Sequence, residues 1–230
     1  MIEIVEVTHT YRVGKETIRV LEIPSLVVGP GERVAVVGPS GSGKSTLIQI
    51  IAGLTLPTTG RVIIDGVDIG ALGESQRDRL RARRMGLIFQ ALNLLGGFTA
   101  LENVLMAAKW SGIKNKFERL QAATALLHRL GLNDRMHVDV RRLSHGEKQR
   151  VAIARALVHQ PSIVLADEPT ASLDSVNKTV VLDELLALVR EKGATLVFVT
   201  HDTTLLSAFT RVLTLGPGGV VSDRSPVPGE

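Results

Sequence analysis

The chain of 230 residues contains no cysteine, and only 3% of its residues are aromatic. Without cysteine it can form neither a disulfide bond nor a thiolate metal site, and its composition suits a reducing cytosol. It also lacks any run of about 18 uncharged apolar residues. Its first ten residues alternate Ile, Val and Glu instead of forming a basic and then apolar leader. We therefore expect a globular protein that neither spans a membrane nor carries a cleaved export signal.

The net charge of +4 is small, but basic residues gather between residues 77 and 84 and again at Arg141 and Arg142. The first cluster is compatible with a nucleic-acid contact, a solvated helix face, or a face close to anionic lipid headgroups. Nucleic-acid binding is disfavoured, because so few aromatic residues leave no stacking platform for bases. We expect no direct nucleic-acid partner.

A glycine-rich stretch, GPSGSGKST, follows a run with the pattern of a buried strand, 33–37, and precedes a run with the pattern of a helix, 47–51. The pattern G-x-x-x-x-G-K-[ST] predicts a phosphate site, because its glycines let successive amide groups point into one concavity at the positive end of a helix. Lys44 adds a charge for the β and γ phosphates, and Ser45 offers a hydroxyl to Mg²⁺. The expected loop consists of Gly38, Pro39, Ser40, Gly41, Ser42, Gly43, Lys44, Ser45 and Thr46.

The rest of the chain divides into strand-like and helix-like stretches. Alternating apolar and charged residues predict antiparallel strands at 2–7 and 17–23. Apolar runs predict strands at 61–66, 85–89, 163–166, 195–199, 211–215 and 220–221, whereas helical periodicity extends over about 92–160. We expect an α/β fold: a P-loop core with a mainly parallel sheet, an N-terminal antiparallel β subdomain and an inserted α-helical subdomain.

These parts form one expected domain over residues 1–230. The nucleotide-binding core with its β subdomain is expected in about 1–90 and 161–221, and the helical subdomain in about 91–160. A loose tail is expected at 222–230.

Polar residues directly follow several predicted strands, where the ligand crevice of an open α/β sheet lies. Asp167 and Glu168 end one buried strand, so that one carboxylate could hold Mg²⁺ and the other polarise the attacking water of phosphoryl transfer. Gln90 could sense a bound nucleotide or be a loop residue in water. His201 could donate a hydrogen bond to a γ-phosphate.

Three further residues allow both a structural and a functional interpretation. Ser144, followed three residues later by Glu147, fits a capping box, and the same helix start could bind an anion. Asp174 fits a helix N-cap. Tyr11, the only tyrosine, could be a packed edge residue or could cover an adenine face.

Taken in this order and spacing, the motifs resemble the nucleotide-binding subunit of ABC transporters from Tyr11 to about Val221. The resemblance implies a subunit that binds ATP and Mg²⁺, hydrolyses ATP, and pairs head to tail with a second copy of itself. It also implies an integral membrane partner and a peripheral location at the cytoplasmic face of the membrane. Residues 98–104 and 165–170 resemble the branch of lipoprotein-releasing, macrolide-efflux and haem-export ATPases, which suggests export or mechanical transmission.

The resemblance also implies roles within one chain. Tyr11 would stack on adenine, and residues 38–46 would form the Walker A loop. Asp167 would end Walker B and serve the metal with Ser45, and Glu168 would be the catalytic carboxylate. The other residues implied in catalysis are Lys44, Gln90 of the Q-loop, which also reaches the metal, and the switch histidine His201.

The signature motif would complete the site of the opposite chain, and Asp174 would be the D-loop residue beside it. The signature residues would be Ser144, His145, Gly146 and Glu147. The usual motif has two glycines followed by glutamine. His145 therefore places a bulky titratable side chain where a glycine is usual, and we expect it either to turn outward or to add a donor.

Two rival functions remain to be compared with this interpretation. Soluble ABC-type ATPases of DNA repair, chromosome organisation or translation usually carry long coiled coils or a second cassette, and the sequence shows neither. A GTPase is disfavoured because the segment 177–180, NKTV, lacks the carboxylate of the guanine-reading N-K-x-D.

Overall fold

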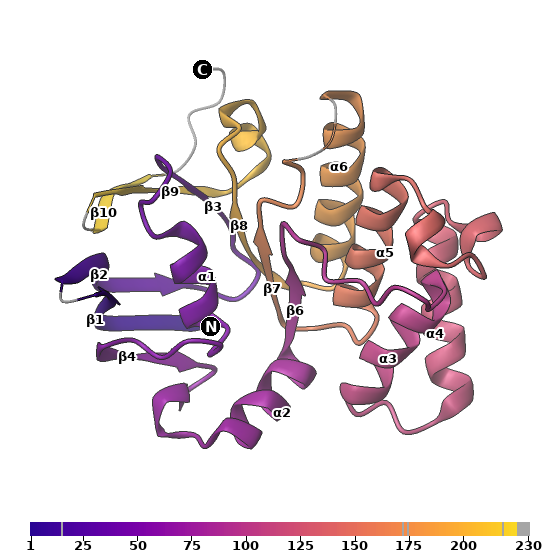
Figure 1. Ribbon diagram of the computed structural model, residues 1–230, viewed down its shortest axis with the longest axis horizontal. Coiled ribbons are helices and arrows are strands. Elements are labelled where there is room, and N and C mark those ends of the chain that lie inside the picture. Colours follow the sequence, from indigo (N-terminus) through magenta and orange to yellow (C-terminus); the bar gives the residue numbers. More distant parts are fainter. Residues whose placement is uncertain (15, 172, 174, 218, 225–230) are drawn as a thin grey trace. The chain divides into compact units, whose positions relative to one another are not determined.

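The computed structural model describes residues 1–14, 16–171, 173, 175–217 and 219–224, and it divides into two compact units (Figure 1). The first unit comprises Met1–Asp78, Leu165–Asp167 and Thr195–Glu230, and the second comprises Arg79–Val164 and Glu168–Ala194. Among the described residues, no helix is both long and apolar enough to cross a membrane. Asp174, an expected D-loop residue, lies outside the described residues.

The strands form two sheets. One has four strands in the order β2-β1-β4-β5, and the other has six in the order β10-β9-β3-β8-β7-β6. The strands are β1 (Ile2–Val13), β2 (Glu16–Val28), β3 (Arg33–Val37), β4 (Thr59–Ile64), β5 (Val67–Asp68), β6 (Met85–Ile88), β7 (Ile163–Asp167), β8 (Thr195–Val199), β9 (Arg211–Gly216) and β10 (Gly219–Arg224).

The helices are α1 (Lys44–Ile51), α2 (Glu74–Arg84), α3 (Ala100–Trp110), α4 (Lys116–Arg129), α5 (His145–Leu157) and α6 (Ser175–Glu191). Four short 3₁₀ helices join them: η1 (Ile69–Ala71), η2 (Asn133–Arg135), η3 (Val140–Arg142) and η4 (Thr203–Ala208).

The four-stranded sheet is the antiparallel subdomain expected at the N-terminus. β1 pairs antiparallel with β2 along its whole length and with β4 on its other side. The alternation that predicts the strand also buries one face at its start, since Ile2 and Ile4 are fully buried. The register with β2 shifts between His9 and Thr10. Beyond this shift the pairing continues to Val13, past the end of the predicted strand.

The six-stranded sheet places the glycine-rich loop. β3 pairs in parallel with β8, with Val36 opposite Val199, and in parallel with β9. After their first residues, Arg33 and Thr195, both β3 and β8 are apolar and mostly buried, as strands covered on two faces are. Because β3 and β8 run in the same direction, the residues that leave their carboxyl ends emerge at the same edge.

The last strand corrects one expectation. Residues 222–224 belong to β10, which pairs antiparallel with β9, so a loose tail from residue 222 is wrong. An ion pair holds this strand: the Arg211 guanidinium donates to the Asp223 carboxylate at 2.7 and 2.6 Å. This hydrogen bonding raises the pKa of Arg211 and lowers the pKa of Asp223. Because this ion pair and not apolar side chains holds the end of β10, the sequence shows no apolar pattern there that would predict the strand.

The second unit contains the expected helical region. α5 packs against α3, α4, α6 and β6, and its residues 151–154 are fully buried. The periodicity over 92–160 therefore marks real helices. In α4 the buried side chains are Ala123 and Leu127, four residues apart on one face.

Candidate active site

The glycine-rich loop leaves β3 and leads directly into α1. The helix begins at Lys44, three residues before the expected start, with Gly43 as its N-cap in a left-handed conformation, φ 89°. The Leu47 amide donates to the Gly43 carbonyl at 2.8 Å and closes the first turn. Gly43 provides no side-chain cap, so the first-turn amides face the loop without a side-chain acceptor from the cap. Such a helix start is suited to an anion.

Two loop positions can only be glycine because the backbone of other strands lies against them. At Gly38, with φ 150°, a Cβ atom would lie 2.1 Å from the Leu215 carbonyl oxygen of β9. At Gly43 it would lie 2.5 Å from the Val20 carbonyl oxygen of β2. The loop is therefore held closely against the backbone of β2 and β9, strands of the first unit.

Lys44 folds back over this loop. Its side chain is buried, and Nζ donates to the carbonyl oxygens of Gly38 and Pro39 at 2.8 Å each. A buried ammonium bonded only to neutral carbonyls is costly unless an anion joins it. The buried Oγ of Ser42 has no hydrogen-bond partner among the described residues. These groups fit a phosphate chain, because each is a donor lacking a negative acceptor.

The first unit brings two further predicted residues to the same sheet. Asp167 ends β7, and Thr200 and His201 follow β8, the strand between β7 and β3. Thr200 is buried, and its amide donates to the Val36 carbonyl at 3.1 Å, which joins this strand end to β3. His201 is exposed. These positions at strand ends are the ones the sequence predicts.

Tyr11 lies on β1 and is 41% exposed. Its ring meets the ring of buried His9 edge to face, with centroids 4.8 Å apart and an interplanar angle of 82°. His9 is opposite Leu21 of β2 in the sheet. The residue before Leu21 is Val20, and the Val20 carbonyl lies against Gly43 of the loop. Tyr11 is thus a partly exposed ring on the strand pair that borders the loop, supported by a buried neighbour.

In the second unit, the capping box expected at residue 144 is confirmed. The Glu147 amide donates to Ser144 Oγ at 3.2 Å, and the Ser144 amide donates to Glu147 Oε2 at 2.7 Å. Helix α5 therefore begins at His145, directly after this cap. His145 is exposed, and a Cβ atom on Gly146 would meet no atom closer than 3.9 Å.

Arg135 is a residue of this motif that sequence reasoning missed. Its Nε donates to Glu147 Oε1 at 2.8 Å. This bond, together with the Ser144 amide, lowers the pKa of Glu147 below its ordinary value. The carboxylate is thereby committed to the helix start, which leaves His145 and Gly146 to face a ligand. Arg135 lies 12 residues upstream in a 3₁₀ turn, so no motif spacing points to it.

Glu168 has an unusual backbone. Its φ is +47°, in the left-handed region, between Asp167 and Pro169. For a residue with a side chain this conformation costs about 1–2 kcal/mol. Strain of this kind gathers at functional positions, where the surrounding structure holds a side chain in one direction.

Gln90 is exposed just beyond β6, at the start of a segment with two further left-handed residues, Leu92 and Asn93. Arg155 of α5 holds that segment, since its guanidinium donates to the carbonyls of Leu92 and Asn93 at 2.8 and 2.5 Å. Burial lowers the pKa of Arg155. The position of Gln90 is therefore coupled to α5, the helix that begins at the signature motif.

Known proteins resemble the chain over nearly its full length. Residues 21–171 match the family model described as ABC transporter. The chain is 43% identical over 211 residues to the lipoprotein-releasing system ATP-binding protein LolD of Legionella pneumophila strain Paris, covering 92% of each. It is 40% identical over 229 residues to the macrolide export ATP-binding/permease protein MacB of Syntrophobacter fumaroxidans, covering 99% of this chain and 32% of that protein.

A solved structure shares the whole fold. The dimeric structure of the ATP-binding cassette MJ0796, bound to ADP and Pi in a post-hydrolysis state, matches with a TM-score of 0.91 at 38% identity over 98% of each chain. The predicted α/β P-loop NTPase fold is confirmed.

Proposed function

Since this chain belongs to the ABC transporter family, in which it is an ATP-binding subunit that powers a membrane transporter, we propose that it works as a head-to-tail dimer with Mg²⁺. The observation that carries the proposal is the buried Lys44 ammonium, bonded to two carbonyls in a loop where Gly38 and Gly43 leave no room for a side chain. We further propose a peripheral location at the cytoplasmic face of the membrane, against an integral membrane partner.

The phosphates of ATP are assigned to the first unit. Lys44 and the backbone N–H groups of the loop, Pro39 excepted, bind the β and γ phosphates, and Tyr11 offers its exposed ring to adenine. The residues assigned to Mg²⁺ are Ser45, Asp167 and Gln90, which supply the hydroxyl, carboxylate and amide oxygens that this ion prefers. When bound, Mg²⁺ neutralises charge that develops on the phosphate oxygens.

Hydrolysis is assigned to Glu168. Its carboxylate orients or deprotonates the attacking water, and its left-handed backbone fixes the direction of the side chain. His201, exposed beyond β8, donates to the γ-phosphate, and Gln90 contacts the water. We also keep Asp174 as the D-loop residue on the basis of the sequence motif alone.

The signature residues are assigned to the ATP of a second copy. The start of α5 has the positive end of a 13-residue helix, and Glu147 is already held by Ser144 and Arg135. Ser144, His145 and Gly146 can then meet the γ-phosphate bound by the loop of the partner chain. The dimeric MJ0796 cassette, similar over 98% of this chain, supports such a pairing. Export or mechanical transmission is supported by the similarity to LolD and MacB proteins.

His145 provides a prediction of its own. It is the exposed first residue of α5, so a ring N–H of its imidazole can donate to the γ-phosphate. We expect His145→Gly to lower the rate of ATP hydrolysis by about tenfold, because a hydrogen bond to a charged group is lost. Steady-state ATPase rates of the two proteins at saturating ATP measure this. An unchanged rate would remove His145 from the site.

Nucleotide competition tests the proposed function. A fluorescent ATP analogue bound to the protein should be displaced by ATP at lower concentration than by GTP. An exposed tyrosine ring stacks on adenine, and the NKTV segment lacks the carboxylate that reads guanine. A strong preference for GTP would overturn the assignment. Tyr11→Ala should lower the affinity for ATP, with Ile18→Ala, an exposed residue opposite it in the sheet, as the control.

A further inference from the structure

The turn between α3 and α4 exposes aromatic side chains in a chain that has one Trp, one Tyr and five Phe. Trp110, at the end of α3, is 75% exposed, and Phe117, in the first turn of α4, is 70% exposed. Single exposed apolar residues are ordinary. Here the two most exposed large hydrophobic side chains flank one short turn, and the packing of the second unit does not require either ring.

The same turn is positively charged. Residues 109–117 read KWSGIKNKF and contain no acidic residue. Lys109, Lys114 and Lys116 are all exposed, and in the described part of the chain no salt bridge involves them. Arg83, at the end of α2, adds a fourth charge nearby, because a Cβ atom on Gly112 would lie 3.7 Å from its Nε.

Internal hydrogen bonds hold the turn in shape. The Arg119 guanidinium donates to the carbonyl oxygens of Ile113 and Lys114 at 2.8 and 3.1 Å. Asn115 caps α4 by accepting from the Phe117 amide at 2.8 Å, and Ser111 Oγ donates to the Ala108 carbonyl at 2.9 Å. Because these hydrogen bonds already order the turn, binding to a partner surface would not carry the entropic cost of ordering it.

A hollow of about 290 Å³ between α3 and α4 extends the apolar area beside this turn. Its apolar lining comes from Phe98, Leu105, Met106 and Leu120. Three basic side chains, Lys109, Lys116 and Arg119, and one acidic side chain, Glu102, also line it.

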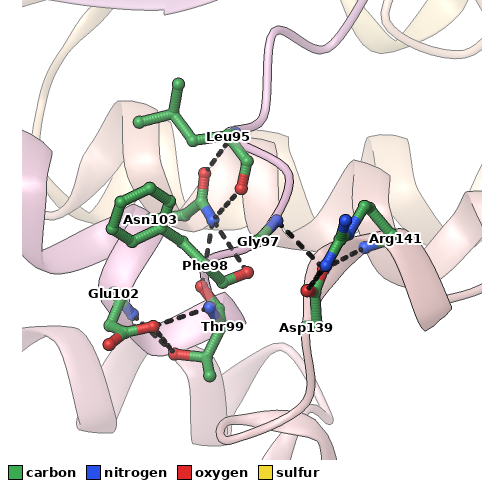
Figure 2. Close-up of polar contacts among 8 residues, drawn as sticks. All are labelled: Leu95, Gly97, Phe98, Thr99, Glu102, Asn103, Asp139 and Arg141. Atoms are coloured by element: carbon green, nitrogen blue, oxygen red, sulfur yellow. Dashed lines mark hydrogen bonds and ion pairs between the residues drawn. The ribbon is translucent and has the colours of Figure 1, made fainter.

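The loop that carries Phe98 is firmly anchored (Figure 2). The Asn103 side chain accepts from the Leu95 amide at 2.8 Å and donates to its carbonyl at 3.2 Å. Asp139 accepts from the Gly97 amide at 3.3 Å. Both the turn and the hollow are therefore preformed.

We propose that the turn formed by residues 109–117 is a membrane-surface contact. Its three lysines lie among anionic lipid headgroups, while Trp110 and Phe117 enter the interface. Trp and other aromatic rings prefer that depth, and basic side chains beside them are attracted to acidic lipid. Arg119 of α4 bonds to the backbone of the turn, so the charges that stay free to meet a partner are those of the lysines. A lysine is a flexible point charge, which suits a fluid array of headgroups more than a fixed carboxylate.

This contact needs no nucleotide, no second copy and no membrane subunit. It goes beyond the proposed function, and its failure would leave the assignment of the ATP site unchanged.

Trp110 is the only tryptophan, so the unmodified protein reports on the contact. The purified chain is mixed with vesicles of phosphatidylcholine, with and without phosphatidylglycerol. We expect the tryptophan emission to shift to the blue and to be shielded from acrylamide only with the anionic vesicles, and the shift to weaken as salt is raised. An emission unchanged by anionic vesicles would overturn the proposal, and it is also the result expected if the turn binds an acidic protein segment instead.

Vesicle sedimentation of variants separates this turn from general charge attraction. Each lysine contributes about fivefold to affinity for an acidic surface. Replacing Lys109, Lys114 and Lys116 with Gln should therefore weaken binding on the order of hundredfold. The matched control replaces three exposed arginines on other elements, Arg61, Arg190 and Arg224, with Gln.

The control variant has the same net charge as the lysine variant and should bind nearly as the parent does. The double change Trp110→Ser and Phe117→Ser should also weaken binding. Equal losses in the lysine variant and the control, or unchanged binding of the aromatic variant, would refute the contact.

Discussion

Replacing Glu168 with Gln is expected to reduce ATP hydrolysis by about two to four orders of magnitude and to leave ATP binding intact. The amide cannot accept the proton of the attacking water, yet it has the size and shape of the carboxyl group. Because Glu168 has φ +47° and Gln has the same backbone preferences, the left-handed conformation costs the variant no more than it costs the parent. The variant should therefore fold normally, bind ATP, and accumulate as an ATP-bound dimer.

Three measurements check this expectation. Equilibrium binding of ATP should be unchanged, phosphate release should almost cease, and size-exclusion chromatography with ATP should show a dimer that persists. Glu118→Gln, the same chemical change at an exposed position of α4, is the matched control and should hydrolyse ATP as the parent does. Hydrolysis by the Glu168→Gln variant at the parent rate would exclude Glu168 as the catalytic carboxylate.

The second large effect is expected at Gly146. A Cβ atom there would meet its nearest neighbour, an Arg150 nitrogen, only at 3.9 Å, so the position can hold a side chain. An aspartate in the first turn of α5 is also favourable for the helix, because it faces the positive end of the dipole. Gly146→Asp should consequently fold as well as the parent. Its carboxylate would nevertheless oppose the γ-phosphate of the ATP held by the second chain.

Repulsion between two such charges at close range is expected to slow hydrolysis on the order of hundredfold or more. ATP binding by the single chain should not change, because the P-loop belongs to the first unit and Gly146 to the second. Gly146→Ala is the control, since it adds a side chain without charge. Thermal unfolding, ATP affinity and ATPase rate of the three proteins measure these effects. Normal hydrolysis by Gly146→Asp would mean that the start of α5 does not face a phosphate.

The sequence predicted the elements best where burial alone decides them. The bounds of β3 and β8 are those expected from their apolar runs. Expectations failed where polar contacts decide the structure. Arg211 and Asp223 extend β10 beyond residue 222, and the left-handed Gly43 starts α1 at Lys44. Neither the Arg211–Asp223 ion pair nor the left-handed conformation of Gly43 gives the sequence a hydrophobic periodicity, so a search for such patterns would not find them.

For the candidate site, the sequence indicated which residues to examine but not their conformations. The spacing of GPSGSGKST predicts a phosphate loop, yet it does not reveal that Lys44 is folded onto the carbonyls of Gly38 and Pro39. Two adjacent carboxylates at the end of a strand indicate that Asp167 and Glu168 belong to the site. The left-handed backbone of Glu168, however, depends on its surroundings and is not visible in the sequence. Arg135 was missed because its contact with Glu147 is formed by the folding of a turn, and no spacing in the signature motif indicates it.

The central claim is that the loop of one chain and the signature residues of another form a single site, and mixing two inactive variants tests it most directly. Lys44→Ala removes the loop ammonium, and Gly146→Asp blocks the signature. In a head-to-tail dimer of the two, one of the two sites combines an intact loop with an intact signature. An equimolar mixture should thus recover roughly a quarter of the parent ATPase rate, because half of the dimers are mixed and half of their sites are whole. A rate no higher than the mean of the two separate variants would contradict the account.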